Sequence, residues 1–124
     1  MTPLPAFSDL RRVGGAVTLA LDLPGDCPAC EGHFPATPIL PAVVQVDWAI
    51  RFARDNFPLP PHFNALRSLK FLRIVQPPVR LTLELAPTGD GRGVTFRYVH
   101  GDAACSTGRI EFSDDAAGPD RSLL

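Results

Sequence analysis

The chain has neither a marked excess of charge of one sign nor a long apolar run. Its 12 Lys and Arg residues against 13 Asp and Glu residues give a formal net charge of −1 at pH 7. Nucleic-acid binding calls for a basic face, so the composition gives no electrostatic case for it. No run approaches the roughly 20 apolar residues of a membrane span, and the N-terminus lacks the apolar centre of a signal peptide. We therefore expect a cytoplasmic protein that binds neither nucleic acid nor membranes.

Cysteine is also scarce, with three residues in the whole chain. Cys27 and Cys30 form a CPAC motif, which suggests a zinc site or a thioredoxin-like redox pair. A structural zinc ion needs four ligands, but Cys105 is the only other thiol in the chain and His33 is the nearest imidazole. A redox pair opens a helix after a strand, whereas the proline inside the motif and Gly32 after it indicate a loop. We expect no metal site and interpret the cysteines as small apolar side chains.

Proline, glycine and the apolar pattern predict one α+β domain over residues 1–124. The hydrophobic content of 45% is ordinary for a soluble domain and allows a core without disulfide bonds. Residues 1–15 contain prolines and end in two glycines, which predicts an irregular lead-in with at most one short helix. The predicted elements that follow are a strand at 17–23, an irregular proline-rich segment at 35–41, a helix at 42–56, strands at 63–75, 79–85, 94–98 and 104–112, and a disordered tail at 114–124.

The predicted helix is apolar around most of its circumference but carries one acid, Asp47. Its apolar residues fall into two neighbouring stripes, Val43, Val46, Ile50 and Ala53 in one and Val44, Trp48 and Phe52 in the other. Such a helix is expected to be largely buried, with an antiparallel sheet curled around it. Burying an uncompensated carboxylate is costly, so Asp47 needs either a partner or a function.

The segment that contains Asp47 resembles the active-site segment of a known enzyme family. It reads GHFPATPILPAVVQVD and resembles the β-hydroxyacyl-acyl-carrier-protein dehydratases, in particular the short ApeI-like dehydratases of aryl-polyene pathways. The family pattern is GHFPG-x-P-(I/V)-(M/L)-PG-V, with an acid fourteen positions after the histidine. His33 and Asp47 stand at these two positions. The later run SLKFLRIVQPPVRL is similar to the family's strand, turn and strand, so the resemblance covers most of residues 16–113 and implies the hotdog fold.

The reaction of this family explains the need for a histidine and an acid. Dehydration of a 3-hydroxyacyl thioester removes a proton from the carbon next to the carbonyl and expels the 3-hydroxyl group. The resemblance implies that His33 is the general base and that Asp47 protonates the leaving hydroxyl. Burial would favour the protonated form of Asp47, which a proton donor needs. The backbone N–H of Ala42, at the positive end of the helix, would stabilise the thioester oxygen.

The resemblance also implies partners but no cofactor. In the family, the substrate is carried on the phosphopantetheine of an acyl carrier protein, and the histidine and acid of one site come from different subunits. We therefore expect a homodimer or a heterodimer of hotdog subunits. Arg67, Lys70 and Arg73 place three cations in seven residues. A charge run is often only a solvated edge, but here it would also form a basic rim for an acidic carrier protein.

Three residues depart from the family pattern. Ala36 and Ala42 replace two glycines, and Arg51 stands where the family usually has glutamine. A methyl group at position 42 is harmless in a helix but clashes if the backbone needs a positive φ. The cation of Arg51 would favour ionised Asp47 and so oppose the effect of burial. Two alternatives therefore stay open, a hotdog thioesterase and a low-activity or non-catalytic subunit of a heterodimer, and coenzyme A is an alternative carrier.

Overall fold

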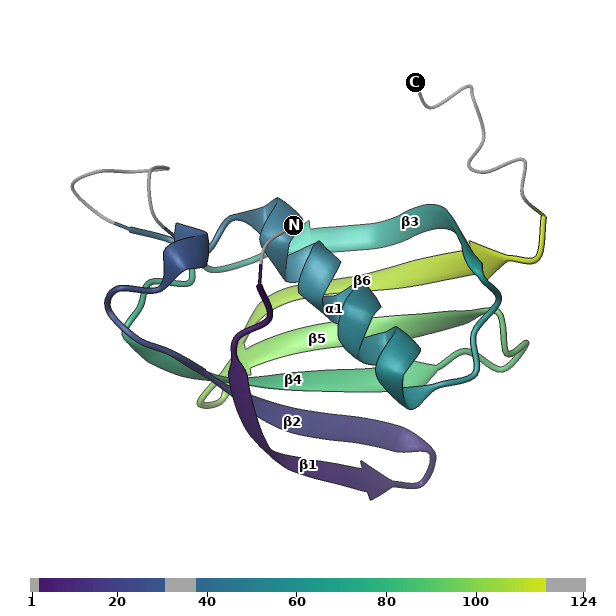
Figure 1. Cartoon of the computed structure of the whole chain (residues 1–124), viewed down its shortest axis with the longest axis horizontal. Coiled ribbons are helices and arrows are strands. Elements are labelled where there is room, and N and C mark those ends of the chain that lie inside the picture. Colours follow the sequence, from purple (N-terminus) through teal and green to yellow (C-terminus); the bar gives the residue numbers. More distant parts are fainter. Residues whose placement is uncertain (1–2, 31–37, 116–124) are drawn as a thin grey trace.

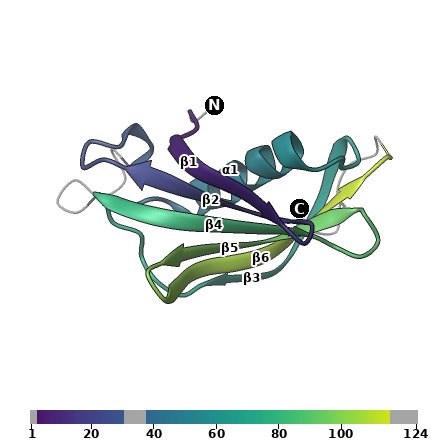
Figure 2. The same ribbon diagram turned by 90° about the horizontal axis from the view of Figure 1, so that it is seen from below.

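The computed structural model describes residues 3–30 and 38–115, which form one antiparallel sheet and one long helix. The elements are β1 (Ala6–Val13), β2 (Ala16–Leu23), the short 3-10 helix η1 (Pro28–Cys30), α1 (Ala42–Asn56), β3 (His62–Phe71), β4 (Val79–Pro87), β5 (Gly93–His100) and β6 (Ala103–Ser113). The strand order is β1-β2-β4-β5-β6-β3. Helix α1 lies across one face of the sheet, and no described element covers the other face, which we call the open face (Figures 1 and 2). The predicted α+β hotdog architecture is confirmed.

The alternation of apolar and polar residues decides which face of each strand meets the helix. In β4, Leu81 and Leu83 are buried, whereas Arg80 and Thr82 are exposed on the open face. Because β2 and β5 alternate in the same way on either side of β4, their apolar side chains continue this inner surface. The largest fully buried side chains of the resulting core are Trp48, Tyr98, Phe52, Leu19, Leu21, Leu81, Leu83, Leu85 and Ile110.

The N-terminal segment forms an edge strand. The prediction of an irregular lead-in over residues 1–15 is therefore wrong for Ala6–Val13, which pairs with β2. Every residue of β1 is exposed, so no alternation marks it in the sequence. A bulge at Asp9, whose φ is 54°, breaks the pattern further. Phe7 packs the strand against α1. Its ring meets the ring of Phe52 edge to face, with 5.3 Å between the two ring centroids.

The opposite edge of the sheet is β3, and this strand is shorter than predicted. It ends at Phe71, so the prediction of a strand over 63–75 is wrong for its last four residues. The backbone amides of Leu72 and Arg73 both donate to the carbonyl of Cys105, at 2.8 and 3.1 Å. These two bonds turn the chain away from the sheet edge. The other predicted strands agree with the observed bounds within two residues at each end.

Helix α1 has the predicted bounds, and one of its two apolar stripes is more completely buried than the other. The stripe that contains Trp48 and Phe52 is buried against the sheet. In the other stripe, Ala53 is buried and Val46 and Ile50 are half-buried against the core, whereas Val43 is 75% exposed. The prediction of a largely buried helix is therefore confirmed for most of α1 but not for its start, at Ala42 and Val43. In the described part of the chain, no helix is both long and apolar enough to cross a membrane.

The close approach of β5 to β6 gives a test of the core. A Cβ atom added at Gly93 would lie 2.6 Å from the backbone oxygen of Ile110, which cannot move without disturbing the strand pair. We expect Gly93→Ala to lower the free energy of unfolding by about 1–3 kcal/mol, measured by urea denaturation. Gly89→Ala is the matched control, since a Cβ atom there meets nothing within 4 Å. Equal stability of the two variants would contradict this packing.

Candidate active site at the start of the central helix

The start of α1 opens onto a pocket. Pro41 is the N-cap and makes no side-chain cap, and no described residue accepts a hydrogen bond from the backbone N–H of Ala42 or Val43. Such unsatisfied N–H groups carry positive partial charge. The pocket has a volume of about 230 Å³ and is lined by Ile39, Leu40, Ala42, Gln45 and the segment Phe71–Val75. An acyl thioester oxygen in this mainly apolar pocket would meet these donors.

The alanine at position 42 is compatible with this arrangement. Ala42 is the first residue of α1, and the described non-glycine residues with positive φ are Asp9 and Ser68. Its methyl group therefore causes no backbone strain. Ala36, the other departure from the family glycines, and His33, the predicted base, both lie outside the described residues.

Asp47 lies one turn after Val43 on the face of α1 that points away from the sheet. Its side chain is 42% exposed in the single chain. Arg51, one further turn along, donates from Nη1 to Asp47 Oδ2 at 3.4 Å, and its own side chain is 26% exposed. The predicted influence of Arg51 on the acid thus has a contact to act through. In the single chain the carboxylate faces outward beside a cation, not into the core.

Behind Asp47, a buried polar cluster joins α1 to β5 and β6. Gln45 and Ser106 are 3% and 0% exposed, and Ser106 Oγ donates to Gln45 Oε1 at 2.7 Å. The hydroxyl of Tyr98 donates to the backbone oxygen of Gln45, also at 2.7 Å. Burial raises the pKa of Tyr98 well above its usual value, and the charge of Asp47 acts in the same direction. Tyr98 therefore remains a neutral donor.

The sequence reasoning missed this cluster, although a signal for it existed. Gln45 is a polar residue inside the same apolar run that draws attention to Asp47. Ser106 and Tyr98 gave no such signal, because a serine and a tyrosine are unremarkable in a strand. Only the pairing of Tyr98 with Ser106 across β5 and β6 places their side chains under the helix.

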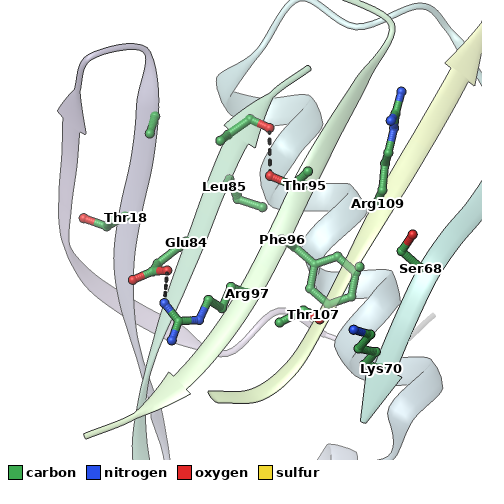
Figure 3. Close-up of a pocket in the computed structure, with 13 residues that line it drawn as sticks. Thr18, Ser68, Lys70, Glu84, Leu85, Thr95, Phe96, Arg97, Thr107 and Arg109 are labelled. Carbon is green, nitrogen blue, oxygen red and sulfur yellow. Dashed lines mark hydrogen bonds and ion pairs between the residues drawn. The ribbon is translucent and has the colours of Figure 1, made fainter. Parts of the chain in front are cut away.

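The three predicted docking cations do not form one group. Arg67 and Lys70 lie on β3 and point to the open face, whereas Arg73 lines the pocket at the start of α1. On the open face, Lys70 instead shares a second pocket of about 590 Å³ with Arg97 of β5 and Arg109 of β6 (Figure 3). The register explains this grouping, since Lys70 pairs with Thr107 and Arg97 pairs with the same residue from the other side.

Most of these cations are neutralised locally. Arg97 contacts Glu84 at 3.4 Å (Figure 3), and Arg67 and Arg109 share Glu111. Lys70 makes no ion pair with any described residue, and the pocket holds three cations against one acid. This pocket on the open face therefore holds more cations than acids, and Lys70 is its one cation without a described ion-pair partner.

The cysteine motif lines neither of the two pockets described above. Cys27 precedes η1 and Cys30 is its last residue, and both are buried and free, as is Cys105. Burial raises the pKa of the Cys30 thiol to about 12, with a hydrogen bond and a charge from Cys27 acting in the same direction. Because the thiolate is the reactive form, this cysteine is a poor nucleophile near neutral pH. The absence of a metal site stays a prediction.

Comparisons with known proteins agree with this architecture. The dehydratase heterocomplex ApeI:P from Xenorhabdus doucetiae matches with a TM-score of 0.78 and 28% identity, over 86% of this chain and 96% of that chain. An uncharacterized protein from Erwinia carotovora subsp. atroseptica matches with a TM-score of 0.66 and 26% identity, over 91% of this chain and 97% of that chain. The pyran synthase domain from module nine of the sorangicin pathway shares the fold. It matches with a TM-score of 0.71 and 17% identity, over 96% of this chain and 43% of that chain.

The family comparison is decisive. No curated protein matches the chain significantly. The model of the ApeI-like family, described as ApeI dehydratase, matches residues 10–109, which include β2 to β5, all of α1 and most of β6. The chain therefore belongs to the ApeI-like dehydratase family.

Proposed function

We propose that this dehydratase converts 3-hydroxyacyl thioesters, carried on an acyl carrier protein, to trans-2-enoyl thioesters. The observation that carries the proposal is the open start of α1, where two backbone N–H groups without a described acceptor adjoin a mainly apolar pocket. A thioester oxygen bound there gains charge as the neighbouring carbon loses its proton. Preorganised donors stabilise that charge by several kcal/mol.

In this mechanism two side chains move protons. His33 removes a proton from the carbon next to the carbonyl, and the electron pair left behind forms an enolate held by the N–H of Ala42. The enolate then expels the 3-hydroxyl group, which takes a proton from Asp47 and leaves as water. His33 ends protonated and Asp47 ionised, so one proton must pass between them through solvent before the next turnover.

The site requires a second hotdog subunit in this proposal, either another copy or a related chain. The outward face near the start of α1, which carries Val43 and Asp47, is covered by no described element. At the β3 edge, five apolar side chains, Leu66, Leu69, Phe71, Leu72 and Ile74, are 38–74% exposed; we call them the β3 surface. An unpaired strand edge with exposed apolar residues favours pairing with another chain. Such pairing would cover Asp47 and supply His33 from the partner.

The proposal predicts the product. Purified protein incubated with a 3-hydroxyacyl thioester of an acyl carrier protein should yield the 2-enoyl thioester, detected by mass spectrometry as the loss of one water. The thioester bond should stay intact, because no hydrolysis is involved. Release of the free carrier thiol would instead indicate a thioesterase. No conversion at any acyl chain length would contradict the proposed reaction.

A low-activity subunit of a heterodimer is the second candidate, and one contact favours it. Arg51 Nη1 lies 3.4 Å from Asp47 Oδ2, and an arginine that holds this oxygen competes for it with the leaving hydroxyl group. If this effect dominates, the chain would supply mainly the pocket and the second subunit would supply the acid. Little conversion by the purified chain, restored by adding a related hotdog subunit, would identify this case.

The pocket on the open face, which holds more cations than acids, suggests where an acidic carrier protein docks. Lys70 lies on the edge strand β3, next to the proposed subunit contact, and has no described ion-pair partner. Arg73 lines the pocket at the start of α1, where it would meet the phosphate of the phosphopantetheine arm. In this proposal the carrier protein contacts the open face first, and the arm then reaches past Arg73 into the site.

We expect Lys70→Glu to lower kcat/KM for carrier-protein thioesters by about tenfold at low ionic strength. The same substitution should leave turnover of a pantetheine thioester unchanged, because that substrate has no carrier protein to dock. Added salt should reduce the difference between variant and wild type. Arg92→Glu, a charge reversal at the exposed β4–β5 turn, is the control. Equal losses with both substrates would exclude a docking role for Lys70.

A further inference from the structure

We propose that Gln45 is a positioning residue, which holds the start of α1 where the thioester oxygen binds. The catalytic role of Gln45 rests on the proposed function, whereas the hydrogen bonds that it makes do not. Gln45 Nε2 donates to the backbone oxygen of Leu40 at 3.2 Å, and its Oε1 accepts from Ser106 Oγ at 2.7 Å. The side chain thus connects strand β6, through the helix, to the residue that precedes the N-cap proline.

Leu40 is held from two sides. Its backbone N–H donates to the oxygen of Val75 at 2.8 Å, and its oxygen accepts from Gln45. Pro41 follows with φ at −64°, which the pyrrolidine ring restricts, and Ala42 comes next. Fixing Leu40 therefore leaves little freedom for the N–H of Ala42. Leu40, Gln45, Val75 and Ala42 all line the same pocket.

The chemistry of position 45 indicates a specific role. Its neighbours on the buried side of α1, including Ala49 and Phe52, are apolar, so an apolar side chain would fill the space without the cost of burying an amide. The glutamine instead makes a hydrogen bond through each end of its amide group, one to Leu40 and one to Ser106. A buried network of this kind fixes one arrangement of the elements that it joins.

A fixed position of the Ala42 N–H matters for catalysis because this donor must lie close to the thioester oxygen. A misplacement of roughly 1 Å at a catalytic group can cost about 100-fold in rate. Loss of the Gln45 contacts should therefore lower kcat more than it raises KM, since the pocket walls that bind the acyl chain remain.

The test is the Gln45→Glu variant, in which the hydrogen bond to the Leu40 oxygen should depend on pH. A protonated glutamic acid can donate to the Leu40 oxygen as the amide does, whereas the ionised form can only repel it. Burial disfavours the charged form, so the variant should keep the contact at low pH and lose it as pH rises. The charged and titratable groups near this side chain are Arg73 on the pocket wall, Asp47 on the helix and the hydroxyl of Tyr98. Arg73 would favour the ionised form, and Tyr98 stays neutral.

Two readouts are measured on the full chain, each relative to wild type at the same pH. The kcat of Gln45→Glu should be about 10- to 100-fold lower near pH 8.5 and recover to within about threefold near pH 5.5. Hydrogen exchange of the backbone amides in residues 38–44 should be faster than in wild type at high pH and equal to it at low pH. Gln45→Met, which cannot make either bond, should show both defects at every pH.

Gln76→Glu is the matched control, since it makes the same chemical change at an exposed glutamine and should show neither effect. A Gln45→Glu variant that matches wild type in both readouts at every pH would overturn the inference. So would equal defects at low and high pH, which would mean general damage to the fold. If wild type dehydrates no substrate, the proposed function fails, and the exchange measurement alone decides whether Gln45 holds the start of α1.

Discussion

Replacement of Asp47 by asparagine is expected to lower kcat for dehydration by a factor of about 10²–10⁴, the usual contribution of a general acid. Asparagine has nearly the same shape but has no proton of suitable acidity to give to the leaving hydroxyl. Because the side chain is 42% exposed in the single chain and is not part of the core, the fold should tolerate the change. The free energy of unfolding should therefore stay close to that of wild type.

Asp55→Asn is the matched control for this experiment. Asp55 is an exposed acid two turns further along α1, so the same substitution there removes a charge from the same helix without touching the proposed site. Both variants are compared by single-turnover kinetics and by thermal unfolding. If Asp47→Asn keeps more than about half of the wild-type kcat, Asp47 is not the acid of this reaction.

If the proposed dimer forms through the β3 surface, Ile74→Glu is expected to separate it into monomers and to remove activity. Ile74 is 74% exposed in the single chain and belongs to the β3 surface, so a glutamate there costs the single chain little. At an interface the same carboxylate would lose its water without gaining a partner, at a cost of several kcal/mol. Dimer affinity should then fall by more than about 100-fold.

Val13→Glu provides the comparison, because Val13 is 73% exposed on β1, the opposite edge of the sheet. Sedimentation at micromolar concentration should show wild type and Val13→Glu as dimers and Ile74→Glu as a monomer. A dimer in all three proteins would mean that the β3 surface is not the contact. A monomeric wild type would mean that the partner is a different chain.

The parts of the fold that the sequence predicts best are those whose pattern has a single physical cause. The bounds of α1 follow from prolines on either side, and the faces of β4 follow from strict alternation. Strand β1 could not be predicted, because it is exposed throughout and carries a bulge, so it exists only through its pairing with β2. The exposure of Val43 at the start of α1 could not be predicted either, since sequence periodicity cannot tell whether a helix face meets its own chain or another.

The residues of the candidate site can also be divided into those that the sequence indicates and those that only the fold brings together. Asp47 and Ala42 could be proposed from the sequence because the motif is local and its residues follow closely along the chain. Gln45 and Ser106 are 61 residues apart, and only the curl of the sheet brings them together. The division of Arg67 and Lys70 from Arg73 also depends on the turn after Phe71, which the sequence does not mark.

Complementation between two inactive variants tests the shared site most directly. His33→Ala and Asp47→Asn are unfolded together and refolded as a mixture, so that about half of the dimers contain one chain of each kind. If one site takes its histidine and its acid from different chains, each mixed dimer regains one intact site. The mixture should then recover about a quarter of wild-type activity, since half of the dimers carry one working site of two. No recovery, in a mixture shown by mass spectrometry to contain mixed dimers, would contradict a site built from two chains.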